Sequence, residues 1–237
     1  MKPLQTYYPF GPPIGYAKLP KEMITDLNKG CDDIIKNEEL SKSQDWSLHL
    51  VGQVEQELLI PKDIINKWGN WFGAQVRAYV SGYVNQLYIP EQTIFESSIE
   101  QTYQAINNMK TSFISAWYIR SFAGDFNPIH THPGCELTCV GFLKVPDLSE
   151  KTKKKGQNPN GALEILSNSG RNEAFFDNDC VGFWPKVGNW YLFPANLRHL
   201  VYPFRCDGER RSFSINMNTD MFQSEGADRY AFRYIKD

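Results

Sequence analysis

Apolar residues recur every three or four positions in two segments of the first 110 residues. Each segment opens at a proline, Pro20 or Pro61, and proline is favoured in the first turn of a helix. We therefore predict two amphipathic helices whose apolar stripes pack against a sheet, and residues 92–110 are open between helix and strand. The first stripe is Met23, Ile24, Leu27, Cys31, Ile34 and Ile35, and the second is Ile64, Ile65, Trp68, Trp71, Phe72, Val76, Tyr79, Val80, Tyr83, Val84 and Leu87.

From about residue 112 the pattern changes to short apolar runs separated by Gly, Pro, Asn and Asp. Such runs are typical of strands in a sandwich or a jelly-roll barrel. We predict an α+β chain with a helix-rich region over 1–110 that packs on the core and is not independent, a β core over 111–220 and a C-terminal extension over 221–237. The predicted strands are Phe113–Phe122, Leu137–Val145, Ala162–Leu166, Val181–Trp184, Trp190–Phe193, Leu200–Phe204 and Ser212–Met217.

Composition narrows the classes of protein that fit the chain. Its 237 residues carry 25 Lys+Arg against 27 Asp+Glu, and a net charge of −2 argues against binding nucleic acid by bulk electrostatics. No apolar stretch approaches the roughly 18–20 residues that span a bilayer, so we expect no membrane partner. The five cysteines form no C-x-x-C pair, which favours a reduced, cytoplasmic protein. The polar segment Ser149–Gly161 is either a solvated connection or, through Lys151–Lys155, a mobile basic lip over a site.

Three of the four histidines fall in a pattern that suits a metal site. His130 and His132 are two residues apart, and in an extended segment such side chains point to the same face. His199 follows an apolar run 67 residues later, where a return strand can place it beside the pair. Imidazole suits several metals, so the ligand type does not name the ion, and two histidines in a polar mouth are the alternative. We interpret His49 as a structural or surface histidine.

Two further positions extend this candidate site. Glu136 follows His132 with the H-x-H-x-x-x-E spacing of cupins, although the second cupin motif, P-x-G-x-x-H, is missing. Strand alternation places Arg210, Ser212 and Ser214 on one face and leaves Arg211 facing solvent. A guanidinium beside a serine hydroxyl binds a carboxylate well, and a surface ion pair of Arg210 with Glu209 is the alternative.

The motifs occur in an order that resembles one known superfamily. They are His130-Thr131-His132-Pro133-Gly134-Cys135-Glu136, Thr138-Cys139-Val140-Gly141-Phe142, Gly161-Ala162-Leu163-Glu164-Ile165-Leu166, Phe193-Pro194-Ala195-Asn196-Leu197-Arg198-His199-Leu200-Val201-Tyr202-Pro203 and Arg210-Arg211-Ser212-Phe213-Ser214-Ile215-Asn216. Together they resemble the Fe(II)- and 2-oxoglutarate-dependent oxygenases. The nearest branch is the H-x-H-P type found in bacteria and tailed phages, including cyanophages, which is related to prolyl hydroxylases. The resemblance covers roughly residues 115–218.

The resemblance implies a double-stranded β-helix, or cupin-like jelly roll, with an N-terminal helical layer. It implies an enzyme that uses Fe(II), 2-oxoglutarate and dioxygen to hydroxylate a C–H bond of a peptidyl or small-molecule substrate, with succinate and CO2 as co-products. The iron ligands and catalytic residues would be His130, His132 and His199, with Glu136 as an alternative ligand. The residues that bind 2-oxoglutarate would be Arg210, Ser212 and Tyr118. Asn216, Trp190 and Asp125 are further candidates for lining the site, and the expected location is the cytoplasm, that of the host if the chain is phage-encoded.

The chain departs from the pattern of the superfamily at three places. His132 stands where most members carry a carboxylate ligand, and Gly141 stands where the strand usually carries tyrosine, which we expect to widen the pocket. The aspartate that usually follows the segment Ala162–Leu166 is missing. Two rival hypotheses stand beside the oxygenase. One is a cupin-type metalloenzyme that does not use 2-oxoglutarate, and the other is a non-catalytic, metal-stabilised binding module. The sequence leaves the substrate and the oligomeric state undetermined.

Overall fold

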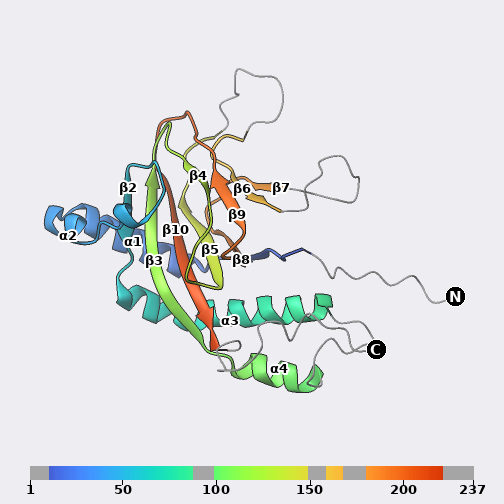
Figure 1. Cartoon of the computed structure of the whole chain (residues 1–237). Helices are drawn as coiled ribbons and strands as arrows, with labels where there is room; N and C mark the ends of the chain where they lie inside the picture. The colour runs from blue at the N-terminus through green and yellow to red at the C-terminus, as the bar shows by residue number, and fades with distance from the viewer. Residues whose placement is uncertain (1–10, 88–98, 149–158, 168–179, 221–237) are drawn as a thin grey trace.

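The structure is a computed structural model that describes residues 11–87, 99–148, 159–167 and 180–220 (Figure 1). The C-terminal extension predicted over 221–237 lies outside these residues. So does Lys151–Lys155, and its role as a lip over a site stays a prediction.

Within the described residues, ten strands form two antiparallel sheets. Figure 1 shows their arrangement. The large sheet has the order β1-β8-β5-β10-β3-β2 and the small sheet the order β4-β9-β6-β7. Each of the seven apolar runs overlaps one of these strands, so the prediction of a jelly-roll core is confirmed. The strands are β1 Gly15–Lys18, β2 Gln56–Leu59, β3 Thr111–Ser121, β4 Asn127–His130, β5 Leu137–Lys144, β6 Leu163–Leu166, β7 Cys180–Phe183, β8 Asn189–Pro194, β9 Arg198–Val201 and β10 Arg210–Thr219.

Both helices predicted from the stripes are present, as α1 Lys21–Ile35 and α3 Lys62–Leu87. The segment 92–110 is ambiguous between helix and strand in the sequence, and its described part contains helix α4, Ile99–Asn108. The pattern missed α2, Glu38–Ser43, the 3-10 turn η1, Ser47–His49, and strands β1, β2 and β4. The three missed strands are four residues long and become strands by pairing with β8, β3 and β9, so their own sequence carries little signal. None of the helices in the described ranges has the length and apolarity needed to cross a membrane.

Strand β10 shows how alternation separates the core from the site. Phe213, Ile215 and Met217 are buried in the core between the large sheet and helices α1 and α3. Ser212 and Ser214, on the other face of β10, line a pocket between the two sheets. A second core lies between the sheets and contains Val140, Phe142, Leu163, Ile165, Tyr191, Phe193, Leu197 and Val201. The large sheet therefore has helices on one face and the pocket on the other.

The expectation that Gly141 widens the pocket is wrong. Gly141 pairs with Phe213 across β5 and β10 and shares its helix-facing side. A Cβ at Gly141 would lie 2.2 Å from Cε1 of Phe213, so the glycine makes room for a core ring. The adjacent Val140 lines the pocket instead.

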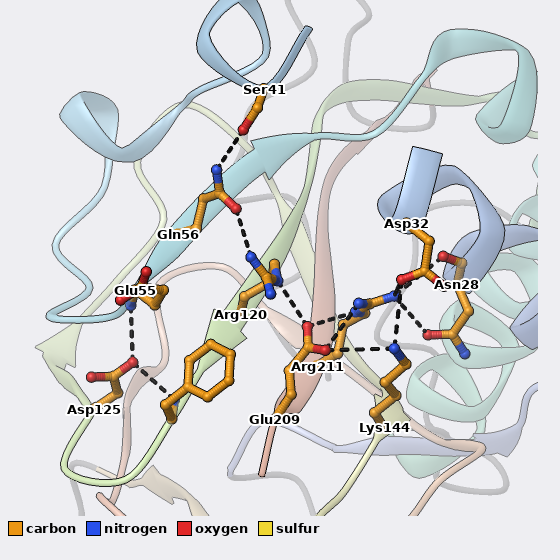
Figure 2. Close-up of polar contacts among 11 residues, drawn as sticks. Asn28, Asp32, Ser41, Glu55, Gln56, Arg120, Asp125, Lys144, Glu209 and Arg211 are labelled. Carbon is orange, nitrogen blue, oxygen red and sulfur yellow. Dashed lines mark hydrogen bonds and ion pairs between the residues drawn. The ribbon is translucent and has the colours of Figure 1, made fainter. Parts of the chain in front are cut away.

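The expectation that Arg211 faces solvent is also wrong. Alternation does turn Arg211 away from Arg210, but helix α1 covers that face and leaves the side chain 1% exposed. Arg211 donates to both carboxylate oxygens of Glu209, at 2.8 and 3.0 Å, and pairs with Asp32 of α1 at 2.8 Å (Figure 2). Arg120 of β3 also donates to Glu209, at 2.9 Å. These charges connect α1 to the neighbouring strands β10 and β3 of the large sheet.

We expect Arg211→Met to lower the free energy of unfolding by about 3 kcal/mol, as measured by urea denaturation. Removing one partner of a buried ion pair leaves the other charge uncompensated, which typically costs about 3–5 kcal/mol. We expect the lower end of this range because Glu209 still pairs with Arg120 in the variant, and because the carboxylate of Asp32 is partly solvated. The matched control is Arg205→Met, at an exposed arginine. A loss below about 1 kcal/mol would show that the network contributes little.

Candidate metal centre and its pocket

The three histidines predicted from spacing lie together at one end of the pocket. His130 ends β4 and is paired in register with His199 of β9. His132 follows two residues later, and its backbone N–H donates to the carbonyl of Ala195 at 2.9 Å. One ring nitrogen from each histidine lies within 4.8 Å of the other two. Two neighbouring strands and a short extension of β4 thus bring the three imidazoles to one point.

Each imidazole has a partner that fixes its tautomer. Nδ1 of His130 is 2.7 Å from the carbonyl of Pro128, and Nδ1 of His199 is 2.9 Å from the carbonyl of Leu197. Nδ1 of His132 is 2.8 Å from Oδ1 of Asn216. These oxygens are acceptors, so each neutral ring carries its proton on Nδ1 and leaves the lone pair on Nε2. Metal-binding histidines are oriented in this way by their outer partners.

Burial keeps these imidazoles neutral near pH 7. It lowers the pKa of His132 to about 4 and that of His199 to about 3, and the neighbouring His130 adds to both shifts. The pKa of His130 is also lowered, mainly by burial. Neutral imidazoles bind a cation without first losing a proton.

The distance between two of the rings fits a bound cation. Nε2 of His132 and Nε2 of His199 are 3.2 Å apart. With both protons on Nδ1, two lone pairs face each other in a buried site, and a cation between them would remove that repulsion. The ring of Trp117 stacks on His132 at 5.6 Å between centroids and shields the same ligand. The donor set therefore fits a divalent transition metal, including iron.

The carboxylate of Glu136, the alternative ligand, is hydrogen-bonded outside the histidine cluster. Its Oε2 accepts hydrogen bonds from the backbone N–H of Thr219 at 2.7 Å and from the hydroxyl of Thr219 at 2.9 Å. Among the described residues, the cluster able to hold a metal is His130, His132 and His199, without Glu136.

Arg210 and Ser212 lie in the same pocket as the histidines. The pocket has a volume of about 510 Å³, and both residues are only 2% exposed. Arg210 Nη1 donates to the carbonyl of Gly161 at 3.1 Å, while its Nε has no hydrogen-bond partner. Burial lowers the pKa of Arg210 to about 10, so the guanidinium stays charged at neutral pH. A buried cation with an unused donor fits an anionic ligand such as a carboxylate.

Tyr118 is not brought together with these residues. Its register partner is Phe213, and it shares the helix-facing side of β3. Its hydroxyl lies close to α1, since a Cβ at Gly30 would be 2.8 Å from it. We therefore leave Tyr118 out of the proposed cosubstrate site.

Of the three further candidates for lining the site, only Asn216 lines the pocket. Trp190 is buried in the core under the helices. Oδ2 of Asp125 accepts from the backbone N–H groups of Glu55 and Phe122, both at 2.9 Å (Figure 2).

The sequence pattern did not identify the residues on the β2 side of the pocket. They are Trp46, Leu50, Val51, Glu57, Trp117 and Ile119, together with His49, which was interpreted as structural or surface. His49 is exposed, stacks on Trp46 at 3.9 Å between centroids and borders the pocket. The one available signal was weak: an acidic residue, Glu57, directly before the apolar run Leu58–Ile60.

Glu57 should make the stability of the protein depend on pH. Burial, with a smaller contribution from Asp45, raises its pKa from 4.5 to about 7. A raised folded-state pKa means that the folded protein binds the proton more tightly, so this contribution to stability is complete below about pH 4.5 and is lost as the pH rises toward 7. The difference between the pKa of Glu57 in the unfolded and in the folded state corresponds to about 3 kcal/mol of folding free energy.

We expect Glu57→Gln to be more stable than the wild type near pH 8, by up to about 3 kcal/mol, with the difference disappearing toward pH 4.5. Urea denaturation at several pH values measures this trend. A pH-independent difference would show that the carboxyl is not desolvated in solution. The matched control, Glu55→Gln, changes an exposed carboxylate of the same segment and should show no such trend.

Comparison with known proteins gives the fold and the enzyme type. Residues 115–216 match the model of a family described as putative 2OG-Fe(II) oxygenase. No curated protein matches. The family match indicates a 2OG-Fe(II) oxygenase, an enzyme whose cofactors are Fe(II), 2-oxoglutarate and dioxygen. The triad His130, His132 and His199 fits its iron site.

Solved structures agree with the double-stranded β-helix fold. The non-heme alpha-ketoglutarate-dependent epimerase SnoN from nogalamycin biosynthesis is 12% identical, with a TM-score of 0.52 over 90% of this chain and 84% of that one. The carbocyclase SnoK from the same biosynthesis is 9% identical, with a TM-score of 0.51 over 86% and 79%. A Pseudomonas putida prolyl-4-hydroxylase is 13% identical, with a TM-score of 0.49 over 86% and 91%. The two structures with TM-scores above 0.5, SnoN and SnoK, confirm the predicted fold.

Proposed function

We propose that this 2OG-Fe(II) oxygenase hydroxylates a C–H bond of a peptidyl or small-molecule substrate and releases succinate and CO2. The observation that carries the proposal is the convergence of three Nε2 lone pairs at one end of a pocket whose other end holds a buried, incompletely paired arginine. A metal would bind the three Nε2 lone pairs, and a dicarboxylate would pair with Arg210, so that together they would occupy both ends of the pocket.

In this proposal His130, His132 and His199 hold the iron, and Arg210 with Ser212 holds the distal carboxylate of 2-oxoglutarate. When bound, Fe(II), 2-oxoglutarate and dioxygen supply the oxidising chemistry, while the protein supplies position and environment. The histidines contribute no negative charge, so the dianionic cosubstrate would balance the charge of the metal. Asn216 keeps the lone pair of His132 directed at the metal site. The hydroxyl of Ser214 is already used, since it donates to the carbonyl of Cys139 at 2.7 Å.

The walls of the pocket favour chemistry that excludes water. Apolar side chains from both sheets, including Trp117, Val140 and Leu163, line it beside the polar groups. A dry site strengthens the interaction between Arg210 and a carboxylate, and it protects reactive species from side reactions.

Three further assignments belong to the same proposal. The order of motifs supports the H-x-H-P branch found in bacteria and tailed phages. The thiols of Cys31, Cys135 and Cys139 are free, which supports a cytoplasmic location, in the host if the gene is carried by a phage. The boundary near residue 110 stays a prediction. Strands β1 and β2, which precede it, complete the large sheet and support the view that the N-terminal region does not fold alone.

The test is an anaerobic titration of the Fe(II)-loaded protein with 2-oxoglutarate, followed by its visible charge-transfer absorption. The proposal expects a band that saturates at one equivalent of cosubstrate. Tight binding of metal without a band would favour a cupin-type metalloenzyme that does not use 2-oxoglutarate. Absence of metal binding would contradict the assignment of the triad.

A further inference from the structure

The metal site and the proposed cosubstrate site occupy only part of the pocket. On β10, Asn216 contacts His132 at one end of the pocket, and Ser214 and Ser212 lead from it toward Arg210. A ligand that joins the histidines to Arg210 would run along this strand. A second group of lining residues extends sideways, across β3 to β2 and to the segment 46–51. The part of the pocket next to β2 and the segment 46–51 is therefore available to the substrate that is oxidised.

Glu57 is the one acidic side chain among the described residues that line the pocket. It lies on β2 opposite Ile119, which in turn pairs with Ser212, so Glu57 is two strands, or about 10 Å, from Ser212. Its residue is 1% exposed, and Oε2 has no hydrogen-bond partner. A buried carboxylate oxygen without a partner is costly, and such an atom in a native structure needs an explanation, which a ligand bound in the pocket would supply.

Two backbone hydrogen bonds hold Glu57 in place, and among the described residues no ion pair connects its carboxylate to a cation. Its carbonyl accepts from the backbone N–H of Trp46 at 2.8 Å, and its own N–H donates to the hydroxyl of Ser47 at 3.3 Å. The other charged lining residue, Arg210, lies across the sheet at the proposed cosubstrate site. Asp45 adds negative potential near Glu57.

We propose that Glu57 binds an ammonium or guanidinium group of the substrate. A cation would neutralise the carboxylate, and Trp46 and Trp117 also line the pocket, where an indole ring favours positive charge through its π electrons. The assignment rests on the proposed function in one respect, that the bound molecule is the one oxidised. Glu57 is then a residue that determines specificity and selects cationic substrates.

The test compares fragments that differ in charge. The full chain, free of metal and in parallel loaded anaerobically with Fe(II) and 2-oxoglutarate, is titrated with n-butylguanidinium, n-butylammonium and the neutral n-pentanol. Binding is followed by calorimetry at a pH of about 8, where the carboxylate is ionised. We expect the cations to bind at least about ten-fold more tightly than the alcohol. Glu57→Gln should remove this preference, and Glu55→Gln should keep it.

The inference is overturned if the wild type does not distinguish cations from the alcohol, or if Glu57→Gln keeps the preference. Its failure can be told from failure of the proposed function, because the metal-free titration does not involve iron. A charge-transfer band without a preference for cations removes only the role of Glu57. A preference that depends on Glu57, without a band, leaves the cation site and removes the oxygenase assignment.

Discussion

Replacing His199 by alanine should abolish stoichiometric Fe(II) binding. The residue supplies one of three converging Nε2 lone pairs, and the two that remain cannot hold the ion on one face. The expected loss exceeds the roughly 10- to 100-fold that removal of an outer hydrogen-bond partner costs. Anaerobic reconstitution followed by measurement of bound iron per chain gives the result directly.

Two control variants make the loss specific to the triad. Glu136→Gln should retain iron, because Glu136 accepts hydrogen bonds from Thr219 and is absent from the histidine cluster. His49→Ala should also retain iron, since it removes an imidazole at the edge of the pocket. Iron lost from Glu136→Gln but kept in His199→Ala would reverse the assignment and favour the carboxylate as a ligand.

Replacing Arg210 by methionine should weaken 2-oxoglutarate binding by at least about 30-fold while iron binding is kept. Removing one partner of a buried, hydrogen-bonded charge pair costs about 2–5 kcal/mol, and each 1.4 kcal/mol is about ten-fold in affinity. Methionine is chosen because it fills much of the space of the buried side chain. Titration of the Fe(II)-loaded variant with 2-oxoglutarate measures the change.

In the absence of ligand, Arg210→Met should have a melting temperature no lower than that of the wild type. Arg210 is a buried cation whose Nε lacks a partner, so its removal relieves a cost of desolvation. Arg198→Met, at an exposed arginine beside His199, is the matched control and should keep 2-oxoglutarate affinity. Iron and cosubstrate lost together, with a lower melting temperature, would mean that Arg210 is structural.

Arg210 and Arg211 illustrate why two adjacent arginines have different roles. Alternation along β10 puts them on opposite faces of the large sheet. One face meets the pocket, where Arg210 lacks a full set of partners, and the other meets α1, where Arg211 binds Glu209 and Asp32. The alternation was evident in the sequence. The cover provided by α1 was not, because it depends on how a helix more than 170 residues away docks on the sheet.

The sequence by itself determined the elements with strong periodicity and the order of the motifs. The helical stripes, the seven strands and the set His130, His132, His199, Arg210 and Ser212 follow from spacing and from the resemblance, because period and residue type are local properties. The tertiary structure decided which of these side chains share a space. It directs Tyr118 to the core and Glu136 to Thr219, and it brings Glu57 into the pocket through the pairing of a four-residue strand. Pairing of this kind depends on contacts between residues far apart in the chain, which no local pattern encodes.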